Sequence, residues 1–319
     1  SLPTPITLPV SLSNEVDFLD CSATRKTFPF SQKEMNEIRK YCDDNKITLY
    51  SFFLAIHSLY LSRINNIYDF AIGTPVLNRT NVKEKNTSGL FIDTIPFSIS
   101  VDTNSNFIDL ATKITTDTMT CFRHQKYPYQ HILKDIKDTT ENTESLYNIL
   151  YSYQRPRSDE KIGNVKYTAT WFQPNAIFND LQIHIHDISD SGLLSLSYDY
   201  KLAKFSEKMI LDMFSRIKHL IKQVITSVSK TKLSDYEIVT ENEKQKLLFD
   251  FNNTHVEYDK TETIHSLIEK QALKTPDKVA LINNDKKITY KELNSRANQI
   301  AHYLRSCGIK KNSFVGLLC

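Results

Sequence analysis

The first 230 residues carry apolar positions at two different spacings, one typical of helices and one typical of strands. Behind the cap residue Thr48, apolar residues from Phe52 to Ile64 recur every three or four positions, which predicts a helix with one buried face. In contrast, Ile95–Val101 alternates apolar with polar residues, as a half-buried strand does. The order of such segments predicts an α/β fold, with a mixed sheet flanked by helices. The other predicted helices are 31–43, 107–122, 129–136 and 206–228, and the other predicted strands are 25–30, 69–77, 147–153, 165–172, 181–188 and 193–200.

Capping and turn residues mark where several of these elements begin and end. Ser31 is followed three positions later by Glu34, which is the spacing of a capping box and predicts a helix start. Prolines at positions 3, 5 and 9 restrict the backbone, so residues 1–20 are expected to be an extended lead-in. Asp190-Ser191-Gly192 predicts the turn that joins the last two strands.

The composition changes after residue 229, where polar and charged residues predict a linker over 231–250. The pattern of helices and strands then restarts. Its elements are a helix at 264–273, a strand at 278–283, a turn at 284–286 and a helix at 291–307 that Gly308 stops. The chain has no initial methionine and ends inside an apolar run, so we expect both ends to lie within a longer protein.

Composition and charge exclude several classes of function. A net charge of +3 with 24% charged residues describes an ordinary globular chain, so no nucleic-acid partner is expected. The six glycines never sit as close as a glycine-rich phosphate loop requires. Five scattered cysteines, without a CxxC pair or an HExxH motif, predict neither a disulfide framework nor a metal site. The scattered cysteines make a reducing cytoplasm the simpler expected location. The longest apolar stretch, at 49–61, is too interrupted to predict a membrane span and is expected to be a buried core helix.

Two HxxxD matches are candidates for a histidine that acts as general base in acyl transfer. His131 and Asp135 are four residues apart on a predicted helix, where a solvated side-chain pair is the simpler interpretation. His186 shares one face of a predicted strand with His184, and its motif ends at Asp190 in the predicted turn. We therefore expect packed or exposed histidines at both places. A serine nucleophile is not predicted, since GxSxG is absent.

Four phrases in the first 230 residues are more specific as an ordered set than alone. They are Ile72–Arg79 (IGTPVLNR), Ser88–Pro96 (SGLFIDTIP), His124–Tyr129 (HQKYPY) and Asn148–Gln154 (NILYSYQ). In this order they resemble the later motifs of condensation domains of nonribosomal peptide synthetases. The resemblance covers about residues 1–230. It implies the C-terminal lobe of a two-lobed fold that is similar to chloramphenicol acetyltransferase.

A second resemblance covers residues 251–319. Its phrases are FNNT at 251–254, TIH at 263–265, KTPDKVAL at 274–281 and ITYKELN at 288–294. They resemble the opening of an amino-acid adenylation domain, which implies that the complete domain uses ATP and Mg²⁺. The family's phosphate-binding loop, amino-acid pocket and catalytic lysine would follow Cys319. Condensation followed by adenylation is the order of an elongation module, which argues against an epimerisation domain.

The condensation resemblance also implies a mechanism and candidate residues. In the family, two carrier domains present aminoacyl and peptidyl groups as phosphopantetheine thioesters in a tunnel between two lobes, and no metal or soluble cofactor is required. The catalytic HHxxxDG belongs to the N-terminal lobe, and no adjacent histidine pair occurs here, so no catalytic residue is assigned to this chain. The resemblance implies that Asp93, Thr94, Asn148 and Ser152 face the tunnel. Asp93 stands where the family usually has asparagine.

Simpler structural roles compete for other residues in these phrases. Thr74, Pro75 and Arg79 are explained more simply by the shape of a strand end and a salt bridge. The tyrosines at 147, 151 and 153 share one face of a predicted strand, so at least some of them are expected in the core.

Three functional hypotheses remain open. The first is part of a peptide-bond-forming synthetase, active only with its other lobe. Its partners would be that lobe, the donor and acceptor peptidyl carrier domains and the rest of the adenylation domain. The second is a non-catalytic, condensation-like platform that recruits another protein, which a broken histidine motif in the preceding lobe would favour. The third is a free-standing acyltransferase that uses His131 or His186, and it predicts acyl transfer by this chain alone.

Overall fold

The computed structural model describes residues 4–9, 20–137, 145–155, 161–162, 165–166, 172–173, 175–187, 193–228 and 230–318. The chain divides into two compact units, Ser1–Leu247 and Leu248–Cys319, each of which is described by itself. The predicted turn at Asp190-Ser191-Gly192 and most of the predicted lead-in lie outside the described residues.

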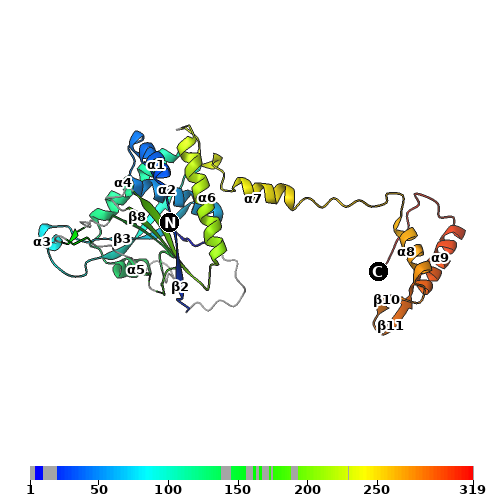
Figure 1. The fold of residues 1–319 in the computed structure, drawn as a ribbon. Helices are drawn as coiled ribbons and strands as arrows, with labels where there is room; N and C mark the ends of the chain where they lie inside the picture. Colours follow the sequence, from blue (N-terminus) through cyan, green and yellow to red (C-terminus); the bar gives the residue numbers. More distant parts are fainter. Residues whose placement is uncertain are drawn as a thin grey trace. The chain divides into compact units, whose positions relative to one another are not determined.

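A seven-stranded mixed sheet forms the centre of the first unit (Figure 1). Strands β3, β5 and β8 run parallel to one another, whereas β4, β9 and β2 pair antiparallel with their neighbours. The strand order is β1-β3-β5-β8-β9-β2, and β4 also pairs with β3. This arrangement confirms the predicted α/β fold with a mixed sheet. The strands are Thr4–Pro5 (β1), Ala23–Pro29 (β2), Asp69–Val76 (β3), Asp93–Ser100 (β4), Ile149–Gln154 (β5), Leu181–Asp187 (β8) and Leu194–Lys201 (β9).

The predicted strand at 165–172 is the one that differs most from the structure. Among its described residues, only Val165–Lys166 (β7) form a strand. This strand pairs with Lys161–Ile162 (β6), separately from the main sheet. Phe172 is not in a strand and is 87% exposed. The rest of this prediction falls outside the described residues.

Four helices pack on one face of the main sheet because each presents apolar residues to it. They are Gln32–Asp44 (α1), Leu49–Asn65 (α2), Phe107–Arg123 (α4) and Glu207–Thr226 (α6). The predicted capping box of Ser31 and Glu34 begins α1. The sequence predicted one buried face for α2, but this helix is buried all round from Ser51 to Ser62. The reason is that α2 contacts α1, α4 and α6 as well as contributing to the core of the sheet.

Two shorter helices complete the first unit. Val82–Lys85 (α3) follows β3, and Tyr129–Lys137 (α5) follows α4. Figure 1 shows α5 on the other side of β3 from α2 and α4, and α5 contacts β4. Among the helices of the described residues, none alone is long and apolar enough to cross a membrane; α1 and α2 pass that test only as a pair bent by 101°.

The segment after α6 begins within the first unit and ends in the second. It contains Leu233–Asp235 (η1), Glu241–Gln245 (α7) and the π-helical turn Lys246–Asp250 (η2). Leu233 and Tyr236 are buried in the core. Arg63 at the end of α2 donates hydrogen bonds to the carbonyl groups of both residues. The first part of this segment is therefore packed against the lobe.

The second unit consists of two helices and a hairpin. They are Ile264–Lys274 (α8), Val279–Asn283 (β10), Lys286–Thr289 (β11) and Tyr290–Ser306 (α9). Asn284 takes a positive φ of 52° in the predicted turn, and Gly308 with φ of 84° ends α9 as predicted. Among the hydrophobic residues described in this unit, only Ala272 is buried.

Candidate functional site

Asp93 and Thr94 lie at the start of β4, where they pair with Val76 and Pro75 at the end of β3. Both are half-buried, and the Thr94 amide donates a 2.8 Å hydrogen bond to the Asp93 carboxylate. The Tyr147 side chain lies nearby. Burial, with the proximity of Tyr129 and Asp93, raises the pKa of Tyr147 to about 12.

Gly73 makes room for this tyrosine. A Cβ atom at Gly73 would lie 2.4 Å from Tyr147 Cε2, which is closer than carbon atoms approach. The absence of a side chain at Gly73 therefore lets the Tyr147 ring cross β3. Tyr147 also packs against Tyr129 of α5, with the ring centroids 5.5 Å apart.

Ser152 belongs to β5 and Asn148 directly precedes this strand, so β3 lies between them and Asp93 and Thr94. Asn148 is half-buried just before β5, and its carbonyl oxygen accepts a 2.9 Å hydrogen bond from the Asp180 amide. This contact sets the start of β5 beside β8. Ser152 is 5% exposed, and its hydroxyl accepts a hydrogen bond of 3.3 Å from Gln154 Nε2. The four predicted residues thus form two groups on different strands.

The sheet face opposite the helices carries polar side chains on three adjacent strands. Residues 149, 151 and 153 of β5 point to the helix side, and residues 150, 152 and 154 point to the other side. In register, Ser152 faces His184 of β8, and His184 faces Ser197 of β9. We call this group the polar strip; its residues are Ser152, Gln154, His184, His186, Ser197 and Asp199.

An ion pair anchors the buried end of the polar strip. Arg25 of β2 binds Asp199 with two hydrogen bonds of 2.6 and 2.8 Å, and Asp199 is 1% exposed. Burial alone would raise the pKa of Asp199, but the contacts from Arg25 and His184 lower it below its ordinary value. Asp199 is therefore a charged carboxylate held inside the protein by its neighbours.

His184 connects this ion pair to β5. Its Nε2 atom lies 3.3 Å from Asp199 Oδ2, although the direction is not that of a good hydrogen bond. Its Nδ1 atom lies 3.5 Å from Gln154 Nε2. Since an amide nitrogen only donates, Nδ1 accepts, and the proton of a neutral His184 ring is on Nε2. His184 is 8% exposed, so these contacts fix a buried ring.

His186 lies at the half-buried end of the polar strip. Its ring stacks on that of His184, with centroids 6.0 Å apart and planes 23° apart. Burial, together with the nearby His184 and Arg25, lowers the pKa of His186 to about 4. The ring is therefore neutral at neutral pH.

The two HxxxD matches form no His–Asp pair among the described residues. His131 is exposed on α5 and packs edge-on against Tyr127, while Asp135 accepts a hydrogen bond from the Tyr127 hydroxyl. His186 is on β8 as predicted, and Asp190 lies outside the described residues.

Arg79 holds the loop between β3 and β4. Its guanidinium donates hydrogen bonds to the carbonyl groups of Glu84, Thr87 and Gly89, and lies 4.1 Å above the Phe91 ring. Arg79 thus shapes the loop through backbone contacts, and among the described residues it forms no salt bridge of the kind predicted. A cavity of about 370 Å³ lies beside it, at the ends of β3 and β5.

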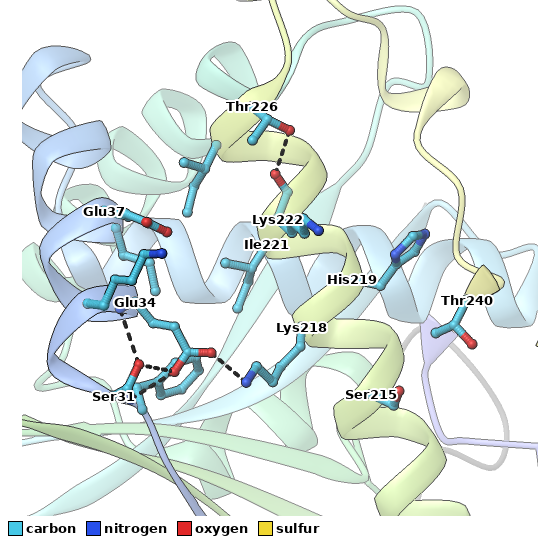
Figure 2. A pocket seen from close by; sticks show the side chains of 14 residues that line it. Ser31, Glu34, Glu37, Ser215, Lys218, His219, Ile221, Lys222, Thr226 and Thr240 are labelled. Carbon is cyan, nitrogen blue, oxygen red and sulfur yellow. Dashed lines mark hydrogen bonds and ion pairs between the residues drawn. The ribbon is translucent and has the colours of Figure 1, made fainter. Parts of the chain in front are cut away.

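A larger cavity, of about 800 Å³, lies between α1 and α6 (Figure 2). Figure 2 shows the Glu34 carboxylate between Ser31 and Lys218, and the Lys218 ammonium lies 2.5 Å from it. Although burial opposes ionisation, the hydrogen bonds from Lys218 and Ser31 lower the pKa of Glu34 to about 2. The cavity is on the helix side of the sheet, and none of the four predicted site residues lines it.

One cluster in the described residues has donor atoms close enough for a metal ion. Single donor atoms of His219, Glu237 and Glu241 lie within 4.8 Å of one another. The Lys244 ammonium contacts both carboxylates, so a lysine already supplies the positive charge there. We assign no metal to this cluster.

Sequence reasoning missed the ion pair at the buried end of the polar strip. Strand alternation had placed His184 and His186 on one face, but it gives no information about which strands are neighbours. Arg25 and Asp199 are 174 residues apart, and only the pairing of β2 with β9 brings them together.

Comparison with known proteins gives the same two families along the chain. Residues 4–248 match the condensation domain family, and residues 268–319 match the AMP-binding enzyme family. Gramicidin S synthase 2 of Brevibacillus brevis is 30% identical over 300 residues, covering 92% of this chain and 7% of that protein. Tyrocidine synthase 3 of Brevibacillus parabrevis is 27% identical over 322 residues, covering 100% of this chain and 5% of that protein. The chain therefore spans only a small part of these curated relatives.

Solved structures share the fold at lower sequence identity. A four-domain nonribosomal peptide synthetase bound to AMP and glycine has a TM-score of 0.76 at 17% identity, and the match covers 97% of this chain and 24% of that one. The condensation domain of Monacolin K polyketide synthase has a TM-score of 0.61 at 18% identity, covering 73% of this chain and 54% of that one.

Proposed function

Because this chain belongs to the condensation domain family and continues into the beginning of an AMP-binding domain, we propose that it is the junction of these two domains in a peptide synthetase elongation module. Residues 1–230 would be the C-terminal lobe of the condensation domain, 231–250 the linker, and 251–319 the start of the adenylation domain. The observation that carries the proposal is the order of the two family matches along one chain.

In this proposal the lobe supplies one wall of a chamber in which amide bonds form. The acceptor amine attacks the donor thioester, the carbon–sulfur bond breaks, and the thiol of the phosphopantetheine arm leaves with a proton. Holding two tethered reactants in place is worth effective molarities of about 10⁵ M or more. Asp93, Thr94, Asn148 and Ser152 would line this wall. The first two lie beside Tyr147, and Ser152 belongs to the polar strip.

The chain alone would not catalyse the reaction. It contains no adjacent histidine pair, so the HHxxxDG motif that serves as catalytic centre in the family would come from the other lobe. The partners would be that lobe, the two carrier domains and the rest of the adenylation domain, in the cytoplasm. ATP and Mg²⁺ would bind in the rest of the adenylation domain. Gly308 and Gly316 are the only glycines after residue 247, and they are too far apart to form a phosphate loop.

The test is amide formation between carrier-bound thioesters, followed by mass spectrometry of the carrier. The protein is compared as this chain alone and as the intact synthetase that contains it. We expect product only from the intact protein. Product from the chain alone would favour a free-standing acyltransferase that uses His131 or His186. If the His131→Ala and His186→Ala variants then turned over the thioester as fast as the unchanged chain, that interpretation would be excluded. No product from the intact protein would favour a non-catalytic platform.

A further inference from the structure

The half-buried end of the polar strip presents hydrogen-bonding atoms that have no partner among the described residues. Gln154 and His186 are register neighbours at the ends of the parallel strands β5 and β8. The Gln154 amide nitrogen contacts Ser152 and His184, but its amide oxygen forms no hydrogen bond with a described side chain or backbone group. The same holds for both nitrogen atoms of the His186 ring.

Both groups are held in place from behind. The His186 ring stacks on His184, whose contact with Asp199 is fixed in turn by the two hydrogen bonds from Arg25. The Gln154 amide cannot turn freely without losing the contacts of its nitrogen. A ligand that binds here therefore does not have to order these two side chains, which favours binding.

The chemistry of this pair fits one class of ligand group. A neutral imidazole has one N–H donor, and the free amide oxygen of Gln154 is an acceptor. The N–H and C=O of a trans amide point in opposite directions, so an amide that lies between the two side chains would donate its N–H to Gln154 Oε1 and accept from the His186 ring with its carbonyl oxygen. Arg25 and Asp199 both lie close enough to affect the protonation of His186, in opposite directions, so this ion pair selects neither a cationic nor an anionic ligand.

We propose that Gln154 and His186 form a subsite for an amide group of the thioester substrate. This inference rests on the proposed function, because that function brings amide-bearing acyl chains to this lobe. The amide could belong to the pantetheine-like arm or to a peptide bond of the acyl group, and the experiment separates these two sources.

The kinetic test uses the intact synthetase with the variants Gln154→Leu and His186→Phe. Soluble acceptor thioesters of the same amino acid are compared. N-acetylcysteamine carries an arm amide, and butanethiol carries none. We expect KM for the N-acetylcysteamine thioester to rise about fivefold in each variant, as for one lost hydrogen bond, with kcat and the butanethiol reaction unchanged. His131→Phe, the same change at an exposed histidine of α5, is the control and should alter neither KM.

A dipeptidyl butanethiol thioester identifies the source of the amide, since its only amide is a peptide bond. A rise in its KM assigns the subsite to the peptide amide. A rise only with N-acetylcysteamine assigns the subsite to the arm. Equal changes for amide-bearing and amide-free thioesters, or no change in either, would overturn the proposal.

A second measurement does not depend on turnover. Diethyl pyrocarbonate modifies neutral imidazoles, and peptide mass spectrometry gives the rate at His186. We expect N-acetyl-S-methylcysteamine to slow this modification and 2-(methylthio)ethanol, which lacks the amide, to leave it unchanged. If the intact protein forms no amide bond but His186 is protected, the proposed function fails and the subsite stands. Absence of protection excludes the arm as the source of the amide and, together with an unchanged KM for the dipeptidyl thioester, overturns the subsite.

Discussion

Arg25 and Asp199, which are 174 residues apart in the sequence, face each other on the adjacent strands β2 and β9 and share two hydrogen bonds of 2.6 and 2.8 Å. The Arg25 side chain is 19% exposed, whereas that of Asp199 is 2% exposed. The carboxylate therefore depends on this guanidinium for most of its compensation. Through His184, the same pair fixes one side of the polar strip.

Replacing Arg25 with methionine keeps most of the side-chain volume and leaves the Asp199 charge buried. We expect Arg25→Met to lower the free energy of unfolding of the first unit by about 3 kcal/mol, because removing one partner of a buried pair leaves an uncompensated charge. Urea denaturation measures this change.

The matched control for this variant is Arg216→Met. Arg216 pairs with Glu243 on the helix side, where the two side chains are 29% and 27% exposed. Solvent screens this pair, so although Arg216 also hydrogen-bonds the Tyr60 hydroxyl, its loss should cost less than the loss of Arg25. Equal losses in the two variants would contradict the burial argument.

His57 predicts how the stability of the first unit depends on pH. This histidine of α2 is 1% exposed, and its ring nitrogens contact the Phe53 carbonyl and the Tyr198 hydroxyl at 2.7 and 3.0 Å. Burial lowers its pKa from 6.5 to about 4. The unfolded chain therefore takes up a proton near pH 6.5, and the folded chain does so only near pH 4. The contribution of His57 to the free energy of unfolding is fully present above pH 6.5 and is lost as the pH falls toward 4.

Because of His57 alone, the free energy of unfolding should fall by on the order of 3 kcal/mol between pH 7 and pH 4. His186 has a similarly lowered pKa and contributes in the same window, so wild-type stability alone does not isolate His57. The variant His57→Asn removes one titrating group. Its stability should be lower at pH 7 but should fall less steeply with pH in denaturation experiments. A slope as steep as that of the wild type would show that His57 does not titrate in this range.

The helices and strands could be predicted from sequence largely because their local signals agree with their packing. The capping box at Ser31 and the alternation in Ile95–Val101 both correspond to elements of the structure. The order of strands in the sheet could not be predicted, because period and caps carry no information about distant partners. For this reason the sequence located Ser152 and both strand histidines but not Arg25, which anchors them.

Gly73 is predicted to be intolerant of even one added carbon. In Gly73→Ala the new Cβ would meet the Tyr147 ring at 2.4 Å, so the ring or the strand must move. We expect a loss of about 1–3 kcal/mol in the free energy of unfolding, as for other overpacked interiors. The same displacement should move Tyr147 away from Asp93 and lower amide formation by the intact synthetase.

The double variant Gly73→Ala/Tyr147→Leu separates the clash from other effects of the alanine. Leucine removes the ring atoms that Cβ would meet, so the cost of Gly73→Ala should be smaller in the Tyr147→Leu background than in the wild type. If the losses of unfolding free energy in the two single variants simply add in the double variant, the strain of Gly73→Ala does not come from the Tyr147 ring.

Gln223 controls how firmly the segment after α6 is held to the lobe. Its amide nitrogen donates to the Glu237 carbonyl at 2.7 Å, and its amide oxygen accepts from the Glu237 amide at 3.0 Å. One side chain thus satisfies both backbone groups of a residue that lies between η1 and α7. In Gln223→Leu both hydrogen bonds are lost, while the buried Leu233 and Tyr236 remain in the core. We therefore expect local opening of this segment rather than unfolding of the lobe.

Amide hydrogen exchange measures that opening directly. The Glu237 amide should exchange about five- to tenfold faster in Gln223→Leu, as for a lost hydrogen bond of about 1 kcal/mol, while the amides of β5 and β8 keep their wild-type rates. Gln32→Leu is the matched control, because Gln32 is exposed on α1 and its side chain contacts only Asn36 among the described residues. Faster exchange in the sheet would mean that the whole lobe is destabilised. Unchanged exchange at Glu237 would mean that Arg63 and Tyr236 hold the segment without Gln223.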